Sequence, residues 1–121
     1  MNDETLRGRE PLDRSPSSLL PEAAQKFIDA TNNEDREALL DVFTPTGTLD
    51  DFGRTFTGRK EIGVWSDQEN IGTHNRITVQ RVTETNETIL AEITVSGLGY
   101  NGRGTFVFHL ADHSIQRLTI R

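Results

Sequence analysis

The chain has 121 residues, which is enough for one domain with a single core. It carries 13 Lys and Arg against 19 Asp and Glu, a formal net charge of −6. The basic residues are scattered, so no positive stripe is present to follow a phosphate backbone, and nucleic acid is not expected as a partner. Cysteine is absent, which excludes disulfides, thiolate chemistry and Cys-ligated zinc.

No run of the sequence approaches the roughly 18 apolar residues of a membrane span. The charged first ten residues do not have the apolar segment of a secretory signal. We therefore expect a cytoplasmic protein that has no membrane partner. Residues 1–18 are expected to form an arm, either a flexible tail or a segment that packs on its own domain or on a neighbouring subunit. The domain itself is expected over residues 19–121.

Three helices are predicted in the first half of the chain. The first begins at Pro21, which suits a first helical turn, and ends near residues 32–33. Asp35 can cap a second helix over residues 36–43, which Pro45 prevents from continuing. A third helix is predicted to begin near Arg59, after a short strand.

That short strand carries two adjacent carboxylates, Asp50 and Asp51, between a turn at Thr46-Gly47 and a break at Gly53. Neighbouring residues in a strand point to opposite faces, so one of the two carboxylates faces the interior. A buried carboxylate is costly unless it is paired or used. Strand geometry alone does not decide which of the two carboxylates this is.

From His74 onward, apolar and polar residues alternate with the period of a strand. The glycine-rich run at 97–104, GLGYNGRG, suits a hairpin or a bulged bend. This order predicts an α+β fold in which three N-terminal helices cover one face of a curved antiparallel sheet. The other face is only partly polar, so we expect a homodimer through it. The apolar residues on that outer face are Val82, Leu90 and Val107.

The run from Phe27 to Trp65, FIDATNNEDREALLDVFTPTGTLDDFGRTFTGRKEIGVW, resembles the nuclear transport factor 2-like superfamily, in particular its SnoaL-like branch of polyketide cyclase and isomerase relatives. The Asp50-Asp51 pair and the spacing of Phe56-x-Gly58-Arg59-x-x-Ile62-x-x-Trp65 carry this resemblance. It implies a cone, in which a strongly bent sheet wraps the helices and leaves a cavity open at one end. It indicates the fold more than the reaction, because members include both enzymes and proteins without catalysis.

The resemblance extends to ketosteroid isomerases, and it places Asp51 where those enzymes carry their proton-shuttling base. Their oxyanion-donating tyrosine corresponds to Phe27, and their partner acid falls near Phe106. Loss of one such donor typically costs about 100- to 1000-fold in rate, so steroid isomerisation is disfavoured. The paired acid and base groups of limonene epoxide hydrolase relatives are not recognisable either.

Asp51 is therefore the candidate catalytic residue for acid/base chemistry without a cofactor, of an isomerase, cyclase or hydrolase type. A carboxylate in an apolar cavity can serve as a base near neutral pH. The alternative is a structural carboxylate that caps a turn or helix, or pairs with Arg54 or Arg59. The indole N–H of Trp65 needs an acceptor, and a contact with Asp51 would favour a structural hydrogen bond.

Five aromatic residues are candidates for binding a ligand, although aromatic residues at such positions commonly form the core. We expect a pocket for a small, largely apolar organic molecule; the alternative is a non-catalytic ligand-binding or dimerisation module with a filled cavity. An open pocket of at least about 300 Å³ beside Asp51 would favour ligand binding. No metal is expected at His109-x-x-Asp112-His113, because a strand and the following turn do not bring these side chains together. The five aromatic candidates are Phe27, Phe43, Trp65, Phe106 and Phe108.

Overall fold

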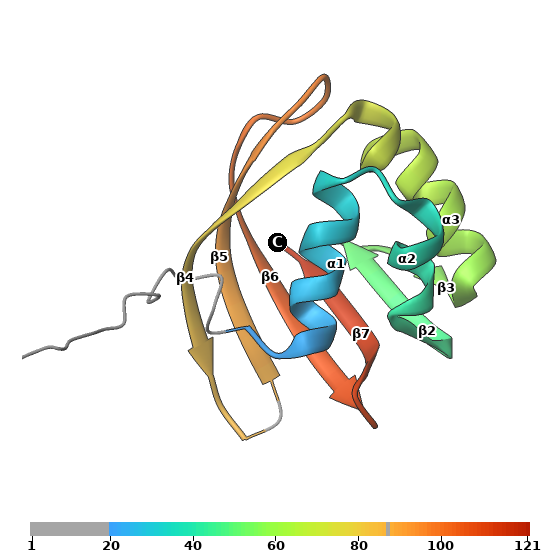
Figure 1. Cartoon of the computed structure of the whole chain (residues 1–121), viewed down its shortest axis with the longest axis vertical. Coiled ribbons are helices and arrows are strands. Elements are labelled where there is room, and N and C mark those ends of the chain that lie inside the picture. The colour runs from blue at the N-terminus through green and yellow to red at the C-terminus, as the bar shows by residue number, and fades with distance from the viewer. Residues whose placement is uncertain (1–19, 87) are drawn as a thin grey trace, which may run out of the picture.

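The computed structural model describes residues 20–86 and 88–121, and the arm expected over residues 1–18 lies outside them. Three helices lie against the concave side of one sheet, so the predicted α+β cone is confirmed (Figure 1). The helices are α1 (Glu22–Asn32), α2 (Arg36–Asp41) and α3 (Gly58–Glu69), and a short 3-10 turn, η2 (Ile71–Thr73), follows α3. The strands are β2 (Phe43–Asp51), β3 (Arg54–Thr57), β4 (Arg76–Glu84), β5 (Thr88–Ser96), β6 (Gly102–Ala111) and β7 (Ser114–Ile120).

The six strands form one sheet in the order β3-β2-β7-β6-β5-β4. All neighbouring pairs are antiparallel except β2 and β7, which run parallel. This pair makes the sheet mixed, whereas an antiparallel sheet was expected. A parallel pair needs a long connection, and more than half of the chain lies between the start of β2 and the end of β7.

The second helix is shorter than predicted, because α2 ends at Asp41 and Phe43 already belongs to β2. The assignment of Phe43 to the helix is wrong: its ring is fully buried and its backbone pairs with Ile115 of β7. The predicted turn at Thr46-Gly47 is instead an irregularity within β2, where the pairing with β7 shifts. A Cβ on Gly47 would lie 3.1 Å from the carbonyl oxygen of Ile115, so this close approach favours glycine.

The prediction that Gly53 breaks the strand is confirmed, but the short strand β3 that follows was not predicted. Phe52 and Gly53 both have positive φ, of 51° and 90°, and they form the tight turn of the β2–β3 hairpin. Asp50 stabilises this turn, because its Oδ1 accepts a hydrogen bond of 2.8 Å from the backbone N–H of Gly53. Of the four residues of β3, only Phe56 is apolar, which is too weak a pattern to indicate a strand.

The interior beneath α1 is filled by four phenylalanine rings. Phe27 of α1 makes edge-to-face contacts with Phe43, Phe106 and Phe108, at centroid distances of 6.0, 5.8 and 6.1 Å. Phe106 and Phe108 contact each other in the same way, at 6.0 Å. We call these four residues the aromatic cluster; such contacts stabilise a core beyond the area they bury.

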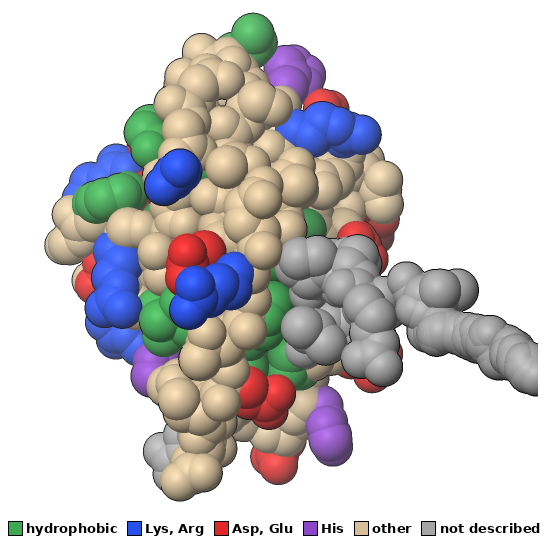
Figure 2. All heavy atoms as spheres, turned by 90° about the vertical axis from the view of Figure 1, so that its left-hand side faces the viewer, with side chains coloured by type: hydrophobic (Ala, Val, Ile, Leu, Met, Phe, Trp, Pro, Cys, Tyr) green, Lys and Arg blue, Asp and Glu red, His purple; other side chains and the backbone are tan. Residues whose placement is uncertain are grey.

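The outer side of the sheet carries a mixture of charged and apolar side chains. Figure 2 shows the molecule from the side of β4, with blue, red and green side chains interspersed. Arg81 and Glu92 lie on this face, with their charged atoms 3.7 Å apart. Leu90 and Val107 are half-buried and pair with each other on this face. The assignment of Val82 to the outer face is wrong, because Val82 pairs with the buried Ala91 and packs against the core. A shift in the pairing of β4 with β5 between Val79 and Arg81 turns Val82 inward. A homodimer through the outer face stays a prediction. Among the described residues, no helix has the length and apolar character needed to cross a bilayer.

Candidate ligand-binding pocket

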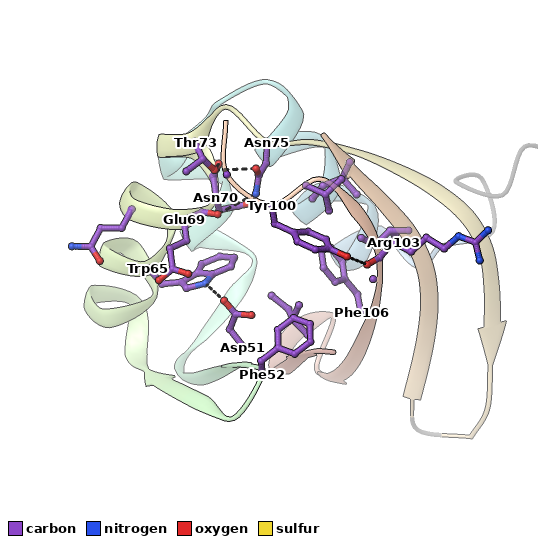
Figure 3. Close-up of a pocket in the computed structure, with 17 residues that line it drawn as sticks. Asp51, Phe52, Trp65, Glu69, Asn70, Thr73, Asn75, Tyr100, Arg103 and Phe106 are labelled. Atoms are coloured by element: carbon purple, nitrogen blue, oxygen red, sulfur yellow. Dashed lines mark hydrogen bonds between the residues drawn. The ribbon is translucent and has the colours of Figure 1, made fainter. Parts of the chain in front are cut away.

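A cavity of about 330 Å³ lies between the sheet and the C-terminal end of α3 (Figure 3). Its wall on the sheet side is largely apolar, and its opposite side is formed by α3, η2 and the loop before β6. The residues that line it are Asp51, Phe52, Trp65, Gln68, Glu69, Asn70, Thr73, Asn75, Ile77, Ile93, Val95, Gly99, Tyr100, Arg103, Gly104, Phe106 and Ile120.

Two further hollows are larger, at about 540 and 610 Å³, but their chemistry is different. One lies along α1 and α2 among acidic side chains such as Asp29 and Asp35, and the other lies over the outer face of β4 to β6. Among the described residues that line these two hollows there is no phenylalanine, tyrosine or tryptophan. The smaller cavity is therefore the candidate site, since ligand pockets combine apolar and aromatic walls with a few polar groups.

The cavity exists because the inward-facing side chains of β6 change from large to small along the strand. Phe108 and Phe106 point inward and belong to the aromatic cluster, and the next inward residue along the strand is Gly104. A Cβ added to Gly104 would meet only the Cδ1 atom of Ile93 at 3.4 Å and the carbonyl oxygen of Arg121 at 3.9 Å. A Cβ therefore fits there in ordinary van der Waals contact, and its absence leaves space open.

Asp51 is the carboxylate that the strand places on the interior face, as predicted. The register aligns it with Ile120 of β7, which in turn pairs with Phe106 of β6. Asp51 is only 9% exposed, and it lines the cavity within this otherwise apolar row. Asp50 points the other way and contacts Arg117 on the outer face.

One oxygen of Asp51 is held by two donors. Trp65 Nε1 donates to Oδ2 at 2.9 Å, and Arg54 Nη2 donates to the same oxygen at 2.7 Å. The alternative of a structural carboxylate expected an arginine or the indole N–H of Trp65 as its partner, and Asp51 contacts both kinds of donor. Within residues 20–86 and 88–121, no hydrogen bond reaches Oδ1 of Asp51. In Figure 3 this second oxygen lies on the side of the carboxylate away from Trp65.

Arg54 also binds a second carboxylate of the cavity wall, Glu69 at the end of α3. The pairing is bidentate, with Nη2 to Oε1 at 2.6 Å and Nη1 to Oε2 at 2.7 Å. The hydrogen bonds from Arg54 lower the pKa of Glu69 below its ordinary value, and the same pairing raises the pKa of Arg54. One guanidinium thus joins β3 to α3 and serves two carboxylates.

Comparison with known proteins identifies the family. The model of the SnoaL-like domain matches residues 24–118, which is most of the chain. The chain belongs to the SnoaL-like family. No curated protein matches the sequence.

Solved structures with the same fold include proteins that hold organic ligands. A proposed polyketide cyclase, protein SMa1630 from Sinorhizobium meliloti, is 25% identical, with a TM-score of 0.76 over 87% of this chain and 98% of that chain. RV0760c from Mycobacterium tuberculosis, solved with estradiol-17beta-hemisuccinate, is 14% identical, with a TM-score of 0.72 over 88% and 93%. A protein from Catenulispora acidiphila, solved with trimethylamine, is 21% identical, with a TM-score of 0.70 over 84% and 85%.

The five aromatic candidates of this SnoaL-like domain separate into two groups. Trp65 and Phe106 line the cavity, and each is only 4% exposed. Phe27, Phe43 and Phe108 have no exposed surface and lie in the core, outside the cavity lining. Phe106 belongs to both regions and forms the boundary between them.

The mouth of the cavity contains residues that the sequence did not indicate as functional. Tyr100 is 60% exposed, and its hydroxyl donates to the carbonyl oxygen of Arg103 at 2.5 Å. The loop that carries it is tied to η2, since the backbone N–H of Leu98 donates to the carbonyl oxygen of Thr73 at 2.8 Å. The position of the only tyrosine within a glycine-rich loop was the available signal.

None of the three histidines is among the residues that line the cavity. His109 pairs across the sheet with Arg117 and Thr88, and Asp112 and His113 form the tight turn between β6 and β7. His74 sits beside the mouth, where its Nδ1 lies 2.9 Å from Oε2 of Glu34. Among the described residues, no group of three His, Cys, Asp or Glu side chains is arranged to hold a metal ion.

Proposed function

We propose that the protein binds a small, largely apolar organic molecule in the cavity beside Asp51. The observation that carries this proposal is an open cavity of about 330 Å³ with an apolar sheet wall and one buried carboxylate. A dimerisation module with a filled cone would have no such space. Structures of the same fold are complexes with estradiol-17beta-hemisuccinate and trimethylamine, which supports the binding of a small organic molecule by this fold.

A binding experiment with a neutral probe tests this function. Isothermal titration calorimetry with 2-naphthylmethanol should show binding, because its bicyclic body suits the apolar wall and its volume is below that of the cavity. Gly104→Val should abolish this binding by filling the space, whereas Thr105→Val, on the neighbouring outward position, should leave it unchanged. Equal binding by Gly104→Val and wild type would contradict the proposed site.

A second candidate function is proton transfer by Asp51, favoured by the oxygen Oδ1 that has no donor among the described residues. Removal of a proton next to a carbonyl group also needs hydrogen-bond donors at the developing oxyanion. Two evident donors of the wall are already engaged: Trp65 Nε1 donates to Asp51, and Tyr100 Oη donates to Arg103. Binding is therefore the better supported function.

Deuterium exchange distinguishes catalysis from binding. Incubation of 1-tetralone with the protein in D₂O should give deuterium incorporation next to the carbonyl group above the buffer rate if Asp51 acts as a base. Asp51→Asn should remove the excess exchange, and Asp50→Asn should retain it. Incorporation at the buffer rate by the wild-type protein, with 1-tetralone bound, would leave a binding protein without this activity.

A further inference from the structure

We infer that the cavity selects ligands that carry a protonated amine on an apolar body. This inference rests on the proposed binding function and adds the chemical class of the ligand. It follows from the charges of the wall, from the one carboxylate oxygen left without a donor, and from the aromatic side chains around the cavity.

The charged groups directed toward the cavity are mainly acidic. Asp51 and Glu69 both line it. Arg103 is the one basic residue of the lining, but Figure 3 shows its guanidinium pointing away from the cavity. The strand explains this direction, because Arg103 precedes the inward-facing Gly104 and therefore points to the outer face.

Arg54 balances only part of this negative charge. Its single positive charge is shared between two carboxylates, so the three side chains together carry a formal charge of −1. Arg54 is half-exposed, whereas Asp51 is buried at an apolar wall, where charges interact more strongly than in water. A cationic ligand would neutralise the remaining charge, and an anionic ligand would increase the repulsion.

The hydrogen bonds of the cavity wall also favour a cationic ligand. Both oxygens of Glu69 accept from Arg54, and Oδ2 of Asp51 accepts from Trp65 and Arg54. Oδ1 of Asp51 is the carboxylate oxygen for which the described residues provide no donor. A carboxylate is an acceptor only, so the matching ligand group is a donor, and an ammonium group supplies both donors and positive charge.

The aromatic side chains around the cavity also favour a cationic ligand. Trp65 and Phe106 form part of the buried wall, while Phe52 and Tyr100 are 69% and 60% exposed at the edge of the cavity. Aromatic rings attract cations that lie over their faces, and protein sites for alkylated ammonium groups are built from such rings. Ile93, Val95 and Ile120 then provide the surface for the apolar body of the ligand.

The test compares three probes that share one skeleton: 2-naphthylmethylamine, 2-naphthylmethanol and 2-naphthoate, titrated calorimetrically at pH 7 and low salt. We expect the amine to bind about tenfold or more tightly than the alcohol, and the carboxylate to bind most weakly. Raising the salt concentration should reduce the advantage of the amine. A carboxylate that binds as tightly as the amine would overturn the inference, and this ranking needs no variant.

Two variants test whether the charge of Asp51 causes the preference for the amine over the alcohol. Asp51→Asn should bring the amine and the alcohol to within about threefold of each other, because it removes the charge while keeping the shape. Asp50→Asn should preserve the wild-type ranking, since Asp50 lies on the opposite face. An undiminished preference in a folded Asp51→Asn protein would overturn the inference.

The outcomes also separate this inference from the proposed function. If amine and alcohol bind equally and Gly104→Val abolishes both, the binding function stands and the preference for a cation fails. If none of the three probes binds, the binding function itself fails, and the inference fails with it.

Discussion

The two halves of the interior lie against the same face of the sheet, but one is filled with side chains and the other contains a cavity. Beneath α1, the aromatic cluster fills the space completely, and Phe27, Phe43 and Phe108 have no exposed surface. Beneath α3 and η2, the same sheet faces a cavity with a carboxylate on its wall. The inward-facing residues of β6 account for the difference, since Phe108 and Phe106 close one half and Gly104 leaves the other open.

This division predicts that the filled half carries most of the stability. Phe27→Ala should lower the free energy of unfolding by about 3–5 kcal/mol, because it removes a fully buried ring and leaves a void among three others. Urea denaturation followed by circular dichroism measures this loss. Phe27→Leu, which keeps most of the volume, should lose clearly less. A loss below about 1 kcal/mol for Phe27→Ala would contradict the central role of the aromatic cluster.

A substitution that fills the cavity of the hollow half should raise the stability instead of lowering it. Gly104→Val should lower the affinity for 2-naphthylmethanol at least tenfold, about 1.4 kcal/mol, because the new side chain occupies the cavity. It should also raise the free energy of unfolding by about 0.5–1 kcal/mol, because glycine is unfavourable within a strand. Calorimetry and urea denaturation measure the two effects. A large loss of stability would show that the wall beside Ile93 has no room for the side chain.

The ion pairs at the edge of the cavity predict a pH dependence. Glu69→Gln should lower the free energy of unfolding by about 0.5–1 kcal/mol at pH 7, a modest effect because the Arg54–Glu69 pair is partly exposed. The pKa of Glu69 is lowered in the folded protein, so the contribution of its charge is fully present above the ordinary value of 4.5. It is lost as the pH falls below that value, through the lowered pKa.

Melting temperatures of wild type and Glu69→Gln, measured from pH 7 to pH 3, check this prediction. The two curves should lie apart at pH 7 and converge below pH 4.5. A difference that stays constant over this range would show that the charge of Glu69 does not contribute to stability.

The smallest effect is expected at Ser66 of α3. Its Oγ is buried and has no hydrogen-bond partner among the described residues. Ser66→Ala should therefore raise the free energy of unfolding by about 0.5 kcal/mol, since it removes an unsatisfied polar group and improves helix propensity. Ser96→Ala, at an exposed position, is the control in the same urea experiment. A clear loss of stability on Ser66→Ala would reveal a partner for this hydroxyl.

The filled half was largely predictable from the sequence, because it follows local periodicity. The period of two places Ile89, Ala91, Ile93, Phe106 and Phe108 inward, and all five are buried. Phe43 was misplaced because the helical spacing continued through it, whereas its pairing with Ile115 depends on a residue far along the chain. The family resemblance supplied the arrangement of helices and sheet that periodicity alone does not give.

The hollow half was only partly predictable. Strand geometry indicated that one of the two neighbouring carboxylates faces inward, and the family resemblance singled out Asp51. Its contact with Trp65 agrees with the need of the indole N–H for an acceptor. The role of Gly104 was missed, because the glycine-rich run was assigned to a turn as far as residue 104, whereas β6 already begins at Gly102. The bidentate pair of Arg54 with Glu69 joins two elements, and no sequence pattern indicates it.

The central claim is that the cavity beside Asp51 is a binding site, and an NMR titration tests it most directly. Addition of 2-naphthylmethanol to ¹⁵N-labelled protein should shift the indole N–H signal of Trp65 and the amide signal of Gly104, with smaller changes at Ala24 and Leu39 in the filled half. Signals of Trp65 and Gly104 that stay unchanged at saturating probe, or shifts confined to residues outside the cavity, would contradict the account.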